Sequence, residues 1–145
     1  MTNHKASVGS ISHGTLRTSD LLLCFASELD YLRGNDDATK LVDRLPTIGE
    51  DDETEIDDSR EDAVNLLETL SDELDRLSPP YCYFGAHEGD GSDFGFWPST
   101  DSIDELPRIK NEEGETLPAE DHCYVNDHGN VTVYSADGTV LLELV

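Results

Sequence analysis

The chain has 145 residues and a formal net charge of -24, which comes from 33 acidic and 9 basic side chains. At this length we expect one domain that buries a hydrophobic core without disulfide support. A surface this acidic repels nucleic-acid phosphates and anionic lipids, and it attracts basic proteins and cations. We therefore expect neither direct binding of nucleic acid nor binding to a membrane surface.

The cysteines and the apolar runs indicate the compartment. Cys24, Cys82 and Cys123 are odd in number and have no CxxC spacing, which argues against a secreted disulfide framework and a structural zinc knuckle. The longest apolar runs, at 21–26 and 140–142, fall far short of the ~20 residues that span a bilayer, and no signal-peptide core is present. A reducing cytoplasm is the expected setting.

In chain order, a polar lead-in precedes the first helix. Residues 1–14 are polar and are expected to be flexible, and we place a single domain over 15–145. Apolar residues then recur at three- and four-residue steps, which predicts a helix over 18–33. Thr18 is the predicted N-cap of this helix, and Gly34 supplies its end.

An acidic stretch separates this helix from a second one. A short amphipathic segment at 41–45 is followed by the acidic run 49–58, which we expect to be a solvated loop because so many like charges oppose compaction. A second helix is predicted over 59–77, where Ser59 and Asp62 approximate a capping box. Its apolar stripe consists of Ala63, Leu66, Leu67, Leu70, Leu74 and Leu77.

After the prolines at 79–80 the period of the apolar residues changes from that of a helix to that of strands. We predict two aromatic strands, a weak connection broken by Pro107, and a final meander with Gly-containing turns, at 81–84, 94–97, 103–109, 122–126, 131–134 and 139–144. Helices first and strands afterwards indicate an α+β fold, with two main helices packed on a four- to five-stranded antiparallel sheet formed by residues 81–145.

The segment YCYFGAHEGDGSDFGFW, residues 81–97, looks at first like a ligand loop. Glu88, Asp90 and Ser92 resemble the first three ligands of an EF-hand loop, but Asp93 stands where that loop requires Gly and Ser99 where it requires Glu. The segment also lacks the G-x-G-x-x-G pattern and the lysine of a phosphate-binding loop. A hairpin with a glycine-dependent acidic turn is the favoured interpretation.

Metal and catalytic sites have little support in the sequence. Soft and imidazole ligands occur at Cys82, His87, His122, Cys123 and His128, but their spacing is poor and strand cysteines usually pack as small apolar residues. No nucleophile elbow is present, and the basic residues are too scattered to hold a nucleic-acid substrate. We predict no enzyme, catalytic residue, metal or cofactor, with a metal-dependent hydrolase as the lesser alternative.

The acidity itself allows three interpretations. It is typical of salt adaptation, because lysine is scarce and acids cover every element. It also suits a surface that occupies a basic groove meant for DNA or RNA, or an acidic chaperone for a basic protein. In the last two cases rows of carboxylates substitute for phosphates, and binding weakens with salt.

Three stretches, SHGTLRTSDLLLCFASEL, YFGAHEGDGSDFGFWP and VNDHGNVTVYSADG, together resemble a family of small uncharacterised tailed-phage and prophage accessory proteins. The likeness covers 13–32 and the chain from Tyr81 onward, and it carries no catalytic residue. It implies a viral accessory protein in the host cytoplasm, a class that commonly binds and blocks host machinery such as restriction and CRISPR effectors.

The leading hypothesis is thus a phage-encoded acidic binding protein that inhibits a host nucleic-acid-handling defence complex by nucleic-acid mimicry. Its expected partner is a basic host protein or nucleoprotein complex. The alternative is a salt-adapted structural or assembly protein without an inhibitory role. The predicted contact residues lie on the second helix and on the hairpin, at Glu68, Asp72, Glu73, Asp75, Glu88, Asp90 and Asp93.

Overall fold

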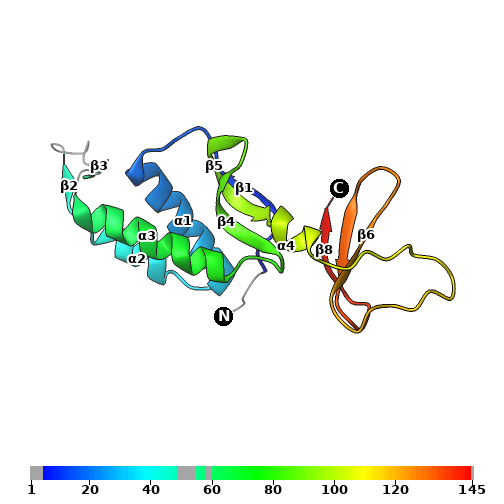
Figure 1. The fold of residues 1–145 in the computed structure, drawn as a ribbon. Helices are drawn as coiled ribbons and strands as arrows, with labels where there is room; N and C mark the ends of the chain where they lie inside the picture. Colours follow the sequence, from blue (N-terminus) through cyan, green and yellow to red (C-terminus); the bar gives the residue numbers. More distant parts are fainter. Residues whose placement is uncertain (1–4, 49–54, 58–59, 145) are drawn as a thin grey trace. The chain divides into compact units, whose positions relative to one another are not determined.

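The computed structural model describes residues 5–48, 55–57 and 60–144 (Figure 1). The chain forms two compact units. The helical unit comprises Met1–Ser78 and Tyr83–Trp97, and the meander unit comprises Pro79–Cys82 and Pro98–Val145. The elements in chain order are β1(Gly9–Ser12), α1(Thr18–Arg33), α2(Asp37–Asp43), β2(Thr47–Ile48), β3(Glu55–Ile56), α3(Glu61–Arg76), β4(Cys82–His87), β5(Asp90–Pro98), α4(Thr100–Asp104), β6(His122–Val125), β7(Val131–Tyr134) and β8(Val140–Leu144).

Helix α1 has the bounds that its apolar periodicity predicts. Gly34 follows it with a φ of 71°, a left-handed conformation that glycine adopts without steric cost, and its amide donates to the carbonyl of Asp30 at 2.8 Å. The prediction of Thr18 as the N-cap is wrong, because Arg17 is the capping residue and Thr18 is already helical. Asp20 lies in the first turn and accepts a hydrogen bond from Thr15 Oγ1 at 2.7 Å.

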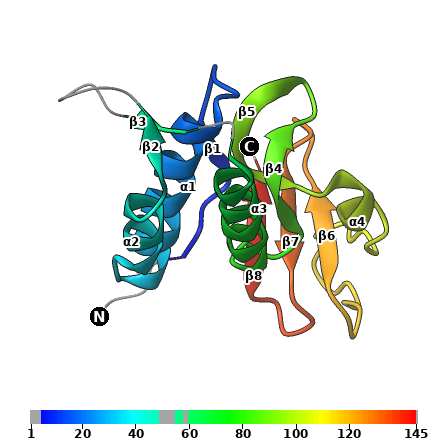
Figure 2. The same ribbon diagram turned by 90° about the vertical axis from the view of Figure 1, so that its left-hand side faces the viewer.

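Helix α2 is capped by a side chain from α1. Its own N-cap residue, Asp36, forms no side-chain cap, whereas the buried carboxylate of Asp30 accepts from the amides of Ala38 and Thr39 at 2.8 and 2.9 Å. Thr39 Oγ1 donates to the same carboxylate at 2.6 Å. Asp30 therefore joins α1 to α2, which lie side by side in Figure 2.

Helix α3 packs its apolar stripe against α1. Ala63, Leu70 and Leu74 are buried, and Leu66 and Leu67 pack beside them. The predicted capping residue Ser59 lies outside the described residues, and Arg60 is the N-cap without a side-chain cap bond. Most of the predicted acidic loop, 49–54 and 58, also lies outside them, while β3 within that run pairs with β2.

The sheet of the helical unit has the strand order β1-β5-β4. Strands β4 and β5 form the predicted aromatic hairpin, and their rings pack on Phe25 of α1: its centroid lies 4.9 Å from that of Phe84 and 5.5 Å from that of Phe94. Strand β1 lies within the segment that we expected to be a flexible lead-in. It approaches β5 so closely that a Cβ on Gly95 would lie 2.1 Å from the Gly9 carbonyl oxygen.

The meander unit holds the second sheet, with the order β6-β7-β8, and confirms the three predicted C-terminal strands. Its core consists of Ile103, Cys123, Val133 and Leu142. The segment before β6 runs along that strand's edge, since Ile109 donates to the Cys123 carbonyl and Cys123 donates to that of Pro107, both at 2.9 Å.

The α+β class is confirmed, but the prediction of a single four- to five-stranded sheet is wrong, because the strands after α3 divide between two three-stranded sheets. Strands β2 and β3 form a separate two-stranded sheet. Strand β1 pairs with one edge of β5. On β4, the Phe84 amide donates to the Asp75 carboxylate at 2.9 Å. The two strand groups also bury their apolar faces in separate clusters. In the part of the chain that the structure describes, every helix is too short or too polar to cross a membrane.

Candidate functional site

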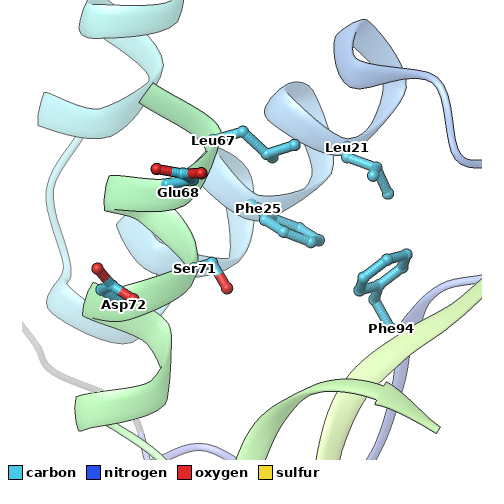
Figure 3. Close-up of a pocket in the computed structure, with 7 residues that line it drawn as sticks. All are labelled: Leu21, Phe25, Leu67, Glu68, Ser71, Asp72 and Phe94. Carbon is cyan, nitrogen blue, oxygen red and sulfur yellow. The ribbon is translucent and has the colours of Figure 1, made fainter. Parts of the chain in front are cut away.

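A pocket of about 330 Å³ opens in the helical unit, between α1, α3 and β5 (Figure 3). Its lining combines apolar side chains with a hydroxyl and two carboxylates. The lining residues are Leu21, Phe25, Leu67, Glu68, Ser71, Asp72 and Phe94.

The side chains on the floor of the pocket are buried, and those at its rim are exposed. Leu21 and Phe25 are only 4% and 2% exposed and belong to the core, so they close the floor. Phe94 is half-buried, and its ring projects from β5 toward that of Phe25. Glu68 and Asp72 are exposed. The pocket thus has an apolar, partly aromatic interior and an acidic rim.

Helical periodicity explains why two carboxylates share this rim. Glu68 and Asp72 are four residues apart on α3 and therefore lie one turn apart on the same face. Leu67 and Ser71 repeat the same spacing one residue earlier, which brings an apolar group and a hydroxyl to the side of α3 that faces Phe25 in Figure 3. One face of α3 thus supplies both the rim and a wall.

The rim carboxylates form no ion pair among residues 5–48, 55–57 and 60–144. The cationic side chains within α1 and α3 are Arg33 and Arg76, and both pair with Glu73. Glu68 and Asp72 consequently keep their charges available to an outside group.

Two of the predicted contact residues on α3 have partners within the chain. Glu73 is held by Arg33 of α1 and by Arg76, whose Nη1 lies 3.0 Å from Glu73 Oε1. Asp75 accepts the hydrogen bond from the Phe84 amide and so fastens β4 to the end of α3. Both carboxylates make contacts within the helical unit, whereas Glu68 and Asp72 form no ion pair among the described residues.

The three predicted acids on the hairpin differ in their surroundings. Glu88 lies in the exposed two-residue turn between β4 and β5. Asp90 accepts from the amide and hydroxyl of Ser92 at 3.0 and 2.8 Å, which lowers the pKa of its carboxyl, and it lies 3.3 Å from His13 Nε2. Asp93 is half-buried, and its Oδ1 has no hydrogen-bond partner among the described residues. These acids lie on β5 and in the turn between β4 and β5, which pair as the predicted glycine-containing hairpin.

The side chains considered for metal or thiol chemistry are dispersed. Among residues 5–48, 55–57 and 60–144, no three His, Cys, Asp or Glu side chains converge to hold a metal ion. Cys123 is buried in the meander core and Cys82 packs against it, so their predicted role in packing is confirmed. Burial raises the pKa of both thiols and of Cys24, which disfavours the nucleophilic thiolate.

The apolar part of the pocket was missed by sequence reasoning. Local patterns predict Phe94 in an aromatic strand and Phe25 and Leu67 in the apolar stripes of two helices, but they do not indicate that these side chains meet around a pocket. The available signal was the pairing of acids at 68 and 72 with smaller or apolar residues at 67 and 71 on one helix face.

No family model, curated protein or solved structure matches this chain. Its function is therefore inferred from charge and geometry.

Proposed function

We propose that this chain is a non-enzymatic binding protein that uses its acidic surface to occupy a basic, nucleic-acid-handling surface of a partner. The observation that carries the proposal is the acidic rim on α3, where Glu68 and Asp72 are exposed and without an ion pair in the described residues. A net charge of -24 adds a long-range attraction toward basic surfaces. Such carboxylates replace phosphates in the partner's groove.

The biological setting belongs to the same proposal. The resemblance to phage and prophage accessory proteins favours a host defence complex as the target, either a CRISPR or a restriction effector. Nucleic-acid mimicry blocks such a complex without any chemistry in the inhibitor, because the inhibitor competes for the surface that binds DNA or RNA. The predicted hairpin acids Glu88, Asp90 and Asp93 extend the proposed contact set.

Salt-dependent capture tests this function. The immobilised full chain is exposed to host lysate at about 50 mM and about 200 mM salt, a range over which binding through several charges weakens strongly. We expect recovery of a basic, nucleic-acid-binding protein at the lower salt and much less at the higher. Recovery of no such protein at about 50 mM salt contradicts the proposal.

A second candidate, a salt-adapted structural or assembly protein, is favoured by the composition of the surface. Exposed acids cover both units, whereas the lysines are Lys5, Lys40 and Lys110. This candidate predicts marked stabilisation by molar salt, which screens repulsion between the carboxylates. A thermal melt in dilute buffer and in molar salt distinguishes the two, since a binding protein adapted to ordinary cytoplasm folds fully in dilute buffer.

A further inference from the structure

We propose that the pocket between α1, α3 and β5 binds one lysine or arginine side chain of the basic partner, with arginine preferred. This inference rests on the proposed function and adds the position and chemistry of a specific contact. It distinguishes shape-dependent recognition at one point on α3 from attraction by net charge alone.

The size of the pocket limits the occupant. At about 330 Å³ it lies at the lower end of the range for small-molecule sites, so it suits a single side chain. Its interior is formed by Leu21, Phe25 and Leu67, with the Phe94 ring across from them in Figure 3. Such an interior favours methylene groups, which lysine and arginine carry between their backbone and their charge.

The rim determines the charge of the occupant. The Cβ atoms of helix residues four apart are separated by about 5–6 Å, so one cationic head group can approach both Glu68 and Asp72. A purely apolar side chain would strip water from these carboxylates without replacing its hydrogen bonds, and an anionic group would be repelled. Charge and apolar surface together therefore select a cation on an aliphatic stem.

Arginine fits this arrangement better than lysine. Its planar guanidinium presents several donors at once and can bond to two carboxylates, whereas the lysine ammonium acts as a compact point charge. A guanidinium also stacks on aromatic faces, and the half-buried Phe94 ring stands at the wall of the pocket. The hydroxyl of Ser71 supplies a further acceptor on the α3 wall.

Binding of an oligo-arginine peptide to the full chain tests the assignment. The pocket variant E68Q/D72N is compared with the matched variant E112Q/E113Q, which removes the same number of charges from an exposed loop of the meander unit. A third variant, Ser71→Leu, fills the pocket and leaves the charge unchanged. We expect both pocket variants to weaken binding by about tenfold and the loop variant to weaken it by no more than about twofold.

Nuclear magnetic resonance and a second peptide complete the test. The Phe94 ring signals of the wild-type chain are expected to shift on addition of the peptide, and a norleucine-substituted peptide is expected to bind far less. Equal weakening by the two double variants, with unmoved Phe94 signals, overturns the pocket assignment and leaves the proposed function standing. Equal binding of the norleucine peptide also overturns it. Absence of any peptide binding at about 50 mM salt contradicts the proposed function itself.

Discussion

Replacing Asp30 by alanine is expected to be among the more destabilising single changes in the helical unit. Asp30 is 8% exposed, and its carboxylate accepts from the Ala38 amide, the Thr39 amide and Thr39 Oγ1. Loss of an N-cap costs about 0.5–2 kcal/mol, and each buried donor left unpaired costs about 1–3 kcal/mol. Because these effects overlap, we expect the free energy of unfolding to fall by about 2–4 kcal/mol.

Thermal unfolding followed by circular dichroism at 222 nm measures this change, since α1, α2 and α3 dominate the helical signal. A loss of 2–4 kcal/mol corresponds to a decrease in Tm of about 5–12 °C for a chain of this size. The matched control is Asp36→Ala at the N-cap position of α2, which forms no side-chain cap and is expected to cost about 0.5 kcal/mol or less. Equal effects of the two substitutions would refute a capping role for Asp30.

Three further predictions concern other parts of the structure. Gly95→Ala places a Cβ 2.1 Å from the Gly9 carbonyl oxygen, so we expect a loss of about 1–3 kcal/mol and faster amide exchange in β1; Gly91→Ala, with open space around it, is the control. Burial raises the pKa of Glu28 above its unfolded value, so the folded state favours the protonated form. Glu28→Gln should therefore be more stable than the wild type at pH 7, with the difference vanishing as pH falls below about 4, and a pH-independent difference would contradict this cause. The hydrogen bond from Tyr81 to Asp121, with smaller effects of burial, raises the pKa of Tyr81 to about 12. The stabilisation from this hydrogen bond is fully present below pH ~10 and is lost as pH rises toward 12. Absorbance at 295 nm should therefore show a tyrosine that titrates at about pH 12, and Tyr81→Phe should remove this step.

Local sequence patterns predicted those helices, strands and turns that are determined by residues close together in the chain. The stripe of α3 and the left-handed Gly34 after α1 follow from helical spacing and glycine chemistry, which act within a few residues. The meander strands β6, β7 and β8 follow from alternation and from Gly-containing turns. In these cases neighbouring residues determine the structure.

Long-range contacts account for what the sequence did not reveal. Strand β1 is a short segment, GSIS, with no apolar alternation, and it forms because β5 offers a free edge and Gly95 admits its backbone. The cap of α2 comes from Asp30, which lies on another helix, while the adjacent Asp36 makes no side-chain cap. Both depend on partners that only the folded chain brings together.

In the candidate site, too, local spacing predicted some residues, whereas the roles of others depend on long-range contacts. Glu68 and Asp72 were predicted as exposed acids from the polar face of α3, and they line the pocket. Glu73 and Asp75 stand on the same helix, but their roles depend on Arg33 and on the Phe84 amide, which sequence spacing does not place beside them. The Phe94 wall likewise requires β5 to pack against α1.

Competition with duplex DNA tests the central claim most directly. A partner captured from host lysate on the immobilised full chain is challenged with increasing duplex DNA at constant ionic strength. We expect the DNA to release the partner, and we expect E68Q/D72N to capture less of it than E112Q/E113Q does. A captured partner that excess DNA does not displace would contradict the proposal that this acidic surface occupies a nucleic-acid-binding site.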